Sequence, residues 1–260
     1  MNQQSPARVL PEHSLPSQPI ASESEGLPSP KISFELPVFS LFPSGQIGRK
    51  ETERFIDQQF FKSYGAQHSE YMPWLISMRQ QGQLSACAGV AFAVDKNPLF
   101  LERYLPSSIE SLVSKNCGMP ITRGQIAEVG NLAGSTFGGG HIGSSRLLYI
   151  VLASVLEEIG IEWMVFTATR PLLISLQRLG LKHCMLGDAD ESFLDDAERS
   201  RWGSYYEHQP RVVAAPLSSA NESIRERTQF AAIREHYAST IADMARHLTP
   251  PALNGSSLAP

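Results

Sequence analysis

Hydrophobic and polar positions follow two different periods along the middle of the chain. The stretches "PWLISMRQ" and "LSACAGVAFAV", separated by the turn-like "QGQ", have the length and apolar content of strands. "GQIAEVGNLA" and "EWMVFTAT" are also typical of strands, and between them "SSRLLYIVLASVLEEIG" is a strongly apolar helix that Gly160 closes. This order predicts a mixed α/β (α+β) fold whose central sheet contains a βαβ unit.

Further elements are expected on both sides of this unit. A helix is predicted to begin near Glu51, with Phe55, Phe60 and Phe61 on its buried side, and Pro106 should break "PLFLERYLPSSIESLV" into two helical pieces. After the central unit, three elements are expected: a helix in "RPLLISLQRLG" with Pro171 in its first turn, a short strand in "KHCML" and a last strand within "WGSYYEHQPRVVAA".

A long helix is predicted from Asn221 to Leu248, opened by Ser223 and Glu226 as a capping box. Apolar residues recur along it every three or four positions and form one stripe on a surface of balanced charge. The stripe favours packing on its own domain, and a homodimer through this helix is the alternative. The residues of the stripe are Phe230, Ile233, Tyr237, Ile241, Met244 and Leu248.

Composition divides the chain into four parts. Eight of the 18 prolines lie in the first 43 residues, mixed with serine and glutamine, so residues 1–45 are expected to form a disordered arm. The folded domain is placed at 46–216, the C-terminal helix at 217–248 and a disordered tail at 249–260. A net charge of -4 argues against a nucleic-acid partner. Three cysteines without a CxxC pair, together with the lack of a signal peptide or a transmembrane span, favour a cytoplasmic protein.

The glycine-rich segment "FGGGHIGSSR" leads from a strand into a helix, where unpaired N–H groups and the helix dipole favour an anion. Gly138, Gly140 and Gly143 match G-x-G-x-x-G, but the following strand ends without the carboxylate that a dinucleotide needs. The P-loop pattern is rejected because Ser144 stands in place of its lysine.

From Gly138 onward, "GGGHIGSSRLL" resembles the pyrophosphate turn "RGKGIGSALL" of the acetyltransferase superfamily. That resemblance implies backbone amides that bind coenzyme A or the phosphopantetheine of a carrier protein. In this sequence His141 stands where the second glycine is usual, and Gly138 replaces the leading arginine. The cofactor-binding residues that it implies are Asn131, Leu132, Ala133, Gly138, Gly139, Gly140, His141, Gly143 and Ser144.

Between about Glu51 and Ala214 the chain resembles the bacterial thermostable hemolysin family. The resemblance rests on "LFLERYL", "EVGNLA", "EWMVFTAT", "LQRLGL" and "WGSYY", in that order. More distantly, the region is similar to acyl-homoserine lactone synthases and N-acyl amino acid synthases. These relatives imply an acetyltransferase (GNAT) type of sheet, with an acyl-CoA or acyl carrier protein thioester as co-substrate and no permanently bound cofactor.

Acyl transfer to an amine requires a base and donors for the oxyanion. Glu128 is the candidate base, and the alternative for it is a structural ion pair with Arg123 or Arg103. Tyr205 is a candidate source of a catalytic hydroxyl, and the backbone near Leu132 and Ala133 a candidate oxyanion site. The candidate substrate-binding residues are Thr167, Thr169 and Arg170. No metal site is predicted, because His183 and Cys184 have no second pair nearby.

The leading hypothesis is therefore an acyltransferase that uses a small amine acceptor, with acyl carrier protein as a possible partner. Two alternatives stay open. One is a membrane-active haemolysin without catalysis, and the other is a synthase that uses S-adenosylmethionine, as the lactone synthases do.

Overall fold

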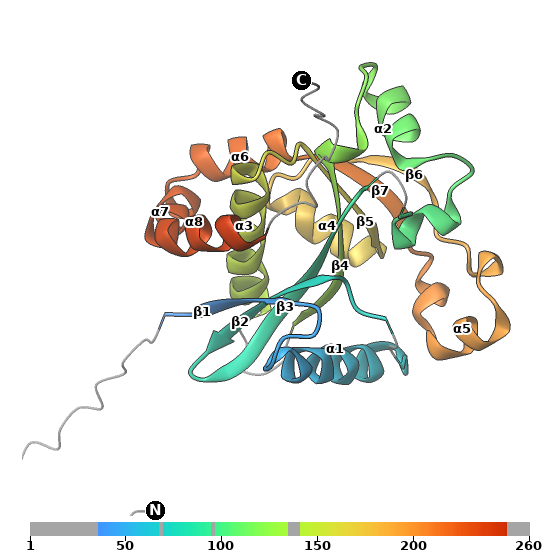
Figure 1. Ribbon diagram of the computed structural model, residues 1–260, viewed down its shortest axis with the longest axis horizontal. Coiled ribbons are helices and arrows are strands. Elements are labelled where there is room, and N and C mark those ends of the chain that lie inside the picture. The colour runs from blue at the N-terminus through green and yellow to red at the C-terminus, as the bar shows by residue number, and fades with distance from the viewer. Residues whose placement is uncertain (1–35, 68–69, 95–96, 135–140, 249–260) are drawn as a thin grey trace, which may run out of the picture. The chain divides into compact units, whose positions relative to one another are not determined.

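A mixed seven-stranded sheet forms the centre of the computed structural model (Figure 1), which describes residues 36–67, 70–94, 97–134 and 141–248. The strand order is β1-β2-β3-β4-β5-β7-β6, and only β4 and β5 run parallel. The predicted mixed α/β class and its central βαβ unit are confirmed. The strands are β1 (Val38–Pro43), β2 (Trp74–Gln80), β3 (Gln83–Phe92), β4 (Ile126–Gly134), β5 (Trp163–Ala168), β6 (Cys184–Asp188) and β7 (Arg211–Pro216).

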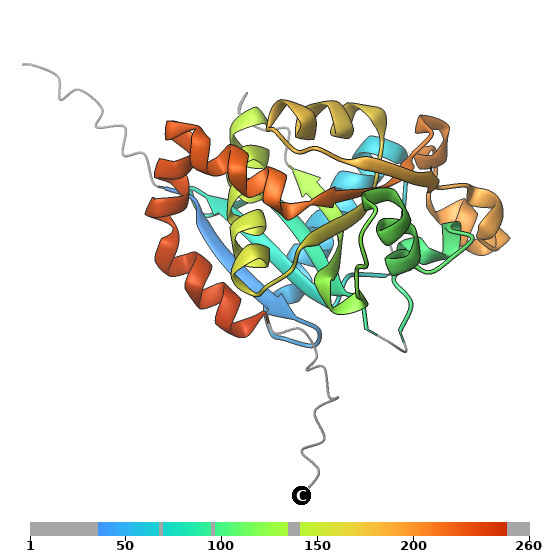
Figure 2. The same cartoon turned by 90° about the horizontal axis from the view of Figure 1, so that it is seen from above.

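Helices cover both faces of the sheet (Figures 1 and 2). On one face, α3 (His141–Glu158) and α4 (Arg170–Arg178) pack with the C-terminal helices. On the other, α1 (Arg49–Tyr64) packs on β2, β3 and β4, and α2 (Ile109–Cys117) lies near β6. Shorter helices are the 3₁₀ helices η1 (Phe100–Tyr104), η2 (Arg123–Gln125), η3 (Glu191–Phe193) and η4 (Tyr205–His208), and α5 (Asp196–Arg201).

Helix α3 is apolar on nearly all sides, which explains its central position. Its middle residues from Leu148 to Leu156 are buried, including a lone Ser154. A helix of this kind must be enclosed by other elements. The strands β2 and β3, by contrast, are joined by a tight turn in which Gln81 and Gly82 have positive φ angles of 52° and 73°. Glycine adopts such an angle without steric cost.

Within α1, the prediction of the buried side was right for one residue and wrong for another. Phe55 is buried and Phe60 packs partly against the same cluster, whereas Phe61 is 62% exposed. Successive residues of a helix point about 100° apart, so Phe60 and Phe61 do not both face the sheet.

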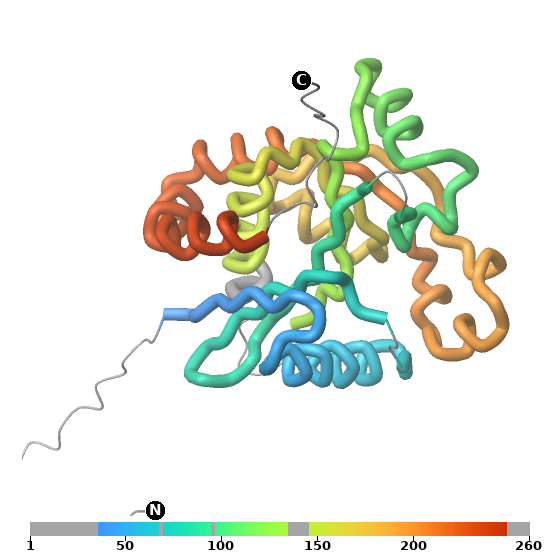
Figure 3. Tube along the Cα trace, in the orientation of Figure 1, coloured from blue at the N-terminus to red at the C-terminus, as the bar shows by residue number. Residues whose placement is uncertain are grey.

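The predicted single C-terminal helix is wrong. The segment forms three helices, α6 (Leu217–Glu226), α7 (Thr228–His236) and α8 (Ala238–His247), which turn around α3 (Figure 3). Arg227 has extended dihedral angles and separates the first two, so Ser223 and Glu226 lie inside α6 and do not cap a helix start. Five of the six stripe residues, all except Ile233, are buried in the core of this chain. The stripe is therefore not available as a dimer surface.

Two further expectations are corrected. Residues 38–43 were expected in the arm, but they form β1, which pairs along its whole length with β2. The domain therefore begins before residue 46, and its core includes the helices of 217–248. Tyr205 and Tyr206 lie in η4 and not in the last strand, which begins only at Arg211. Among the helices that the structure describes, none has the length and apolar character needed to cross a bilayer.

Strands β4 and β5 pair over three residues only, and this shapes the site. Ile126, Ala127 and Glu128 face Trp163, Met164 and Val165. Beyond Glu128 the two strands separate, since β4 continues beside β3 to Gly134 and β5 continues beside β7 to Ala168. The two strands thus separate at the centre of the sheet.

Candidate active site

A cavity of about 1640 Å³ lies across the separated strands. Pockets for one drug-sized molecule usually measure about 300–1,000 Å³, so this one has room for two substrates side by side. Its aromatic side, next to α1 and η1, is formed by Phe60, Tyr64, Tyr71, Phe100, Tyr104, Trp202 and Tyr205. Its apolar section, next to α3 and α4, is formed by Leu148, Leu152, Met164, Phe166, Leu172, Leu176, Leu179, Leu181 and Phe230.

Glu128 lines this cavity from the last paired position of β4, with 2% of its surface exposed. Its Oε2 accepts the N–H of Phe100 at 2.8 Å and its Oε1 accepts the N–H of Leu101 at 3.2 Å. These are the first N–H groups of η1, which have no partner within the helix. Burial raises the pKa of Glu128 to about 8, although the two N–H bonds act in the opposite direction. Its proton is therefore exchangeable near neutral pH.

The two arginines considered as ion-pair partners of Glu128 are engaged elsewhere. Arg123 binds Glu102 at 2.7 Å and Glu110 at 2.8 Å. Arg103 binds Glu198 at 2.9 Å and lies over the ring of Phe100. Among the described residues, no salt bridge to Glu128 is formed. Backbone amides, and not a cation, hold the carboxylate in place.

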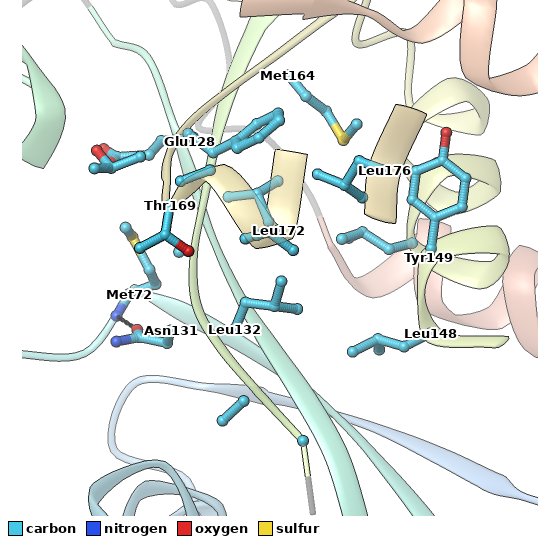
Figure 4. Close-up of a pocket in the computed structure, with 18 of the residues that line it drawn as sticks. Met72, Glu128, Asn131, Leu132, Leu148, Tyr149, Met164, Thr169, Leu172 and Leu176 are labelled. Atoms are coloured by element: carbon cyan, nitrogen blue, oxygen red, sulfur yellow. Dashed lines mark hydrogen bonds between the residues drawn. The ribbon is translucent and has the colours of Figure 1, made fainter. Parts of the chain in front are cut away.

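A β-bulge follows Glu128 in β4. Between the pairs Gly89–Gly130 and Cys87–Ala133, β4 contributes two residues, Asn131 and Leu132, where β3 contributes one. Asn131 has a φ angle of 47°, which asparagine tolerates better than most residues. Its Oδ1 accepts the N–H of Met72 at 2.7 Å (Figure 4). Asn131 was predicted to bind the co-substrate, but its side chain is used to hold the segment before β2.

Met72 is fixed from two sides. Its carbonyl accepts a hydrogen bond from the buried Arg49 at 2.7 Å, while its N–H binds Asn131. A Cβ on Gly89 would come within 2.6 Å of Met72 Cβ, and one on Gly130 within 2.4 Å of Met72 Cε. Glycine at these two positions therefore lets Met72 lie directly against the bulge. Figure 4 shows Leu132 on the other side of this contact, beside Leu172.

Two of the three predicted substrate-binding residues reach the cavity. Thr167 and Thr169 both line it where β5 has left β4, and the Oγ1 of Thr167 is buried without a hydrogen-bond partner. Arg170 is exposed at the start of α4 and is not part of the lining. The structure thus places the two predicted hydroxyls, and not the predicted arginine, at the separation of the strands.

Tyr205 belongs to the aromatic side of the cavity. It lies edge-on to Tyr64, with ring centres 5.2 Å apart, and 5.1 Å from the ring centre of Trp202. Burial raises the pKa of Tyr205, so its phenol stays protonated at neutral pH. Near it, the hydroxyls of Tyr104 and Tyr206 are 2.5 Å apart. Glu70 and Glu198 also line the aromatic side of the cavity.

Most of the predicted glycine turn lies outside the described residues. Gly138, Gly139 and Gly140 belong to the segment 135–140, and the side chains of residues 141–145 are likewise outside the description. The backbone of α3 begins at His141, so Gly143 and Ser144 are in its first turn. The binding of an anion at this turn stays a prediction. In the described part of the chain, no three His, Cys, Asp or Glu residues gather in a way that could hold a metal ion.

Several residues of the site were not singled out from the sequence. Phe100 and Leu101 act through backbone N–H groups, which carry no sequence signal. The role of Met72 and of the two glycines beside it emerges only when the segment before β2 packs across β3 and β4. Arg146, which lines the cavity from α3, had a weak signal as a charge at the start of an apolar run.

The divided sheet and the cavity across it define a class of mixed α/β protein with a cleft between two separating central strands. A family model described as "Thermostable hemolysin" matches residues 43–221. The chain belongs to this family, as its sequence resemblance implied. No curated protein matches the chain.

The chain is also similar to several solved structures. The AHL synthase LasI is 13% identical, with 70% of this chain and 90% of that chain covered and a TM-score of 0.48. FeeM, an N-acyl amino acid synthase from uncultured soil microbes, is 11% identical, with 75% and 98% covered and a TM-score of 0.48. MesI, a CoA-dependent acyl-homoserine lactone synthase, is 12% identical, with 77% and 95% covered and a TM-score of 0.44.

Proposed function

We propose that this protein is an acyltransferase that moves an acyl group from an acyl-CoA or acyl carrier protein thioester to an amine. The observation that carries the proposal is the cavity at the separation of β4 and β5, with a carboxylate of raised pKa at the last paired position. The reaction joins two molecules, and a cavity of this size holds both reacting groups at one place.

Glu128 is the proposed base. An amine is protonated near neutral pH and attacks a thioester only after it loses a proton. A carboxylate has four acceptor positions, and the N–H groups of Phe100 and Leu101 occupy two of them. The remaining positions can take a proton from the ammonium group. A pKa of about 8 suits this role, because the base and its conjugate acid are then both populated near neutral pH.

The remaining steps follow from the thioester. The amine nitrogen forms a bond to the carbonyl carbon, and negative charge develops on the carbonyl oxygen. We assign the stabilisation of that charge to backbone N–H groups at the bulge, near Leu132 and Ala133. The C–S bond then breaks, the attached nitrogen releases the extra proton that it still carries, and the leaving thiolate takes up a proton from a donor that the released proton restores. Tyr205 is the proposed donor, because its phenol is protonated and lines the cavity.

The two sides of the cavity support different substrates. The aromatic rings suit an ammonium group through cation–π contact. The apolar section suits an aliphatic acyl chain, because its lining offers few hydrogen-bond partners. Thr167 and Thr169 lie between them and are proposed to position the reacting groups.

Intact-mass analysis of the products tests this function. The purified protein is incubated with acyl-CoA or acyl carrier protein and a panel of amines, with and without S-adenosylmethionine. A new amide is expected from the wild type, and Glu128→Gln should lower its rate at least about a hundredfold, since general base catalysis typically contributes this much. Glu158→Gln, an exposed residue at the end of α3, is the matched control and should keep full activity.

Two outcomes would overturn the proposal. One is that Glu128→Gln, with an unchanged fold by circular dichroism, turns over as fast as the wild type. The other concerns the family description, which names a haemolytic phenotype. If the purified protein lyses erythrocytes without donor and acceptor, and Glu128→Gln lyses them equally well, the protein acts on membranes directly.

A further inference from the structure

Three arginines line the end of the cavity that lies near the start of α3 and the end of α4. Arg146 of α3, Arg178 of α4 and Arg227 between α6 and α7 all line this end. The guanidinium groups of Arg146 and Arg227 lie 5.6 Å and 5.1 Å from the ring centre of Phe230, and Arg227 donates to the carbonyl of Arg178 at 3.0 Å. The guanidinium groups of Arg146 and Arg227 therefore lie around one ring, with the backbone of Arg178 beside Arg227.

This positive charge has no counter-ion within the described residues. The neighbouring Arg225 and Arg234 both bind Glu157, at 3.0 Å and 2.9 Å, whereas no carboxylate pairs with Arg146, Arg178 or Arg227. The carboxylates that line the cavity, those of Glu70, Glu128 and Glu198, are on its aromatic side or at the strand separation. Arg178 and Arg227 are exposed and Arg146 is partly buried, so this end of the cavity offers an anion three cationic side chains without a competing carboxylate in the described residues.

Two buried polar atoms at the same end also lack partners. The Nε of Arg146 and the hydroxyl of Tyr149 are buried and make no hydrogen bond to any residue that the structure describes. Tyr149 is only 7% exposed, follows Arg146 by one turn of α3 and lines the same cavity. Unsatisfied buried donors are rare in folded proteins and often mark the place of a ligand group that is not present.

The apolar section joins this end to the strand separation. Figure 4 shows Leu148, Leu172 and Leu176 between Tyr149 on one side and Leu132 and Thr169 on the other. A ligand that reaches the arginines through this section needs an apolar body. A polar group in the middle of that ligand would be buried against leucine without a hydrogen-bond partner.

We propose that Arg146, Arg178 and Arg227, together with Tyr149, form an anion subsite for the carboxylate or phosphate at one end of an aliphatic chain. The body of the chain lies in the apolar section, and its other end points to the strand separation beside Glu128. Guanidinium groups match carboxylate and phosphate oxygens in geometry and charge, and the Tyr149 hydroxyl supplies a further donor. This inference goes beyond the proposed acyl transfer and does not depend on it.

Binding by the full chain, measured calorimetrically without donor or acceptor, tests the subsite. The probes are dodecanoate, dodecyl phosphate, methyl dodecanoate and inorganic phosphate. The three probes with an aliphatic chain are used below the concentrations at which they aggregate. The two anionic chains should bind at least about tenfold more tightly than the neutral ester, as expected for charge-assisted hydrogen bonds. Comparison of the affinities of dodecanoate and dodecyl phosphate shows whether the subsite prefers a carboxylate or a phosphate.

Variants make the test specific. Arg146→Gln and Arg227→Gln should bring dodecanoate and dodecyl phosphate down to the affinity of the ester, and ester binding should stay unchanged, which also shows that the variants are folded. Arg225→Gln, whose side chain binds Glu157, should keep the preference. The subsite is refuted if the ester binds as tightly as the anions, or if both variants keep the preference. If inorganic phosphate binds as tightly as dodecyl phosphate, the aliphatic chain of the ligand does not contribute to binding, and this part of the proposal is refuted.

Because no acyl transfer is measured, this test and that of the proposed function fail independently. A protein that binds the anionic chains but transfers no acyl group would keep the subsite and lose the proposed reaction. A protein that transfers acyl groups without any preference for anionic chains would do the reverse.

Discussion

At the scale of the residue, Glu128 combines two influences that act on its pKa in opposite directions. Its carboxylate accepts two backbone N–H groups, which favour the charged form, and its burial favours the neutral form more strongly. The pKa of about 8 has a consequence for stability. In the unfolded chain Glu128 loses its proton near its ordinary pKa of 4.5, whereas the folded chain retains it up to about pH 8.

The contribution of Glu128 to the free energy of unfolding is therefore complete below about pH 4.5 and is lost as the pH rises through about 8. In Glu128→Gln this titration is absent. We expect the difference in stability between wild type and variant to shift in favour of the variant between pH 5 and pH 8. Urea unfolding of both proteins at these two pH values measures the shift. An identical pH dependence for the two would mean that Glu128 is already ionised in the folded protein at pH 5.

At the scale of the element, the bulge in β4 is held by a contact from outside the strand. Asn131 binds the N–H of Met72, and Met72 is in turn fixed by Arg49. The bulge directs Leu132 toward the cavity, on the strand that also carries Glu128. The geometry of the proposed oxyanion site thus depends on Met72, which comes 59 positions before Asn131 in the sequence.

Substitution of Asn131 separates the hydrogen bond from the backbone angle. Asn131→Ala removes the acceptor of the Met72 N–H. It also places alanine at a φ angle of 47°, which alanine tolerates less well than asparagine, so we expect a loss of about 2–4 kcal/mol of unfolding free energy. Asn131→Gly keeps the angle at low steric cost and should lose about 1–3 kcal/mol. Asn131→Asp keeps the acceptor and should remain close to the wild type. Chemical unfolding measures all three, and an Asn131→Ala protein as stable as the wild type would contradict the role of this contact.

At the scale of the whole molecule, the C-terminal helices complete the core. Residues of α7 and α8 pack against α3, and α8 also contacts β1. Tyr237, between the two helices, is edge-on to Phe39 with ring centres 5.0 Å apart, and its hydroxyl donates to the carbonyl of Pro37 at 2.9 Å. The first strand and the last helices thus stabilise each other across 200 residues of sequence.

Tyr237 allows this long-range contact to be measured. Tyr237→Ala removes a buried ring and should cost about 3–5 kcal/mol of unfolding free energy, as large-to-small changes of aromatic residues do. Tyr237→Phe removes only the hydrogen bond to Pro37 and should cost about 0.5–1.5 kcal/mol. Urea unfolding monitored by circular dichroism distinguishes the two. A cost of less than 1 kcal/mol for Tyr237→Ala would mean that the C-terminal helices are not part of the cooperative core.

The sequence by itself determined the elements from Arg49 to Pro216 that have a strong local signal. Apolar periodicity located β2, β3, α3 and β5, and prolines and glycines marked their ends, because these signals act within a few residues. The same signals placed Glu128 on a central strand one loop before a helix start. These local signals did not predict the break between α6 and α7 at Arg227, because neither a proline nor a glycine stands there.

Tertiary structure alone decided what surrounds these residues. The helix breaks at Arg227 because α6, α7 and α8 must turn around α3 to bury their apolar stripe, and local helix propensity does not oppose such a turn strongly. Three features of the site depend on contacts between segments that are distant in sequence. They are the hydrogen bonds to Glu128, the packing of Met72 against the bulge and the proximity of the three arginines. Such contacts depend on packing and backbone hydrogen bonds between elements, which a one-dimensional pattern does not record.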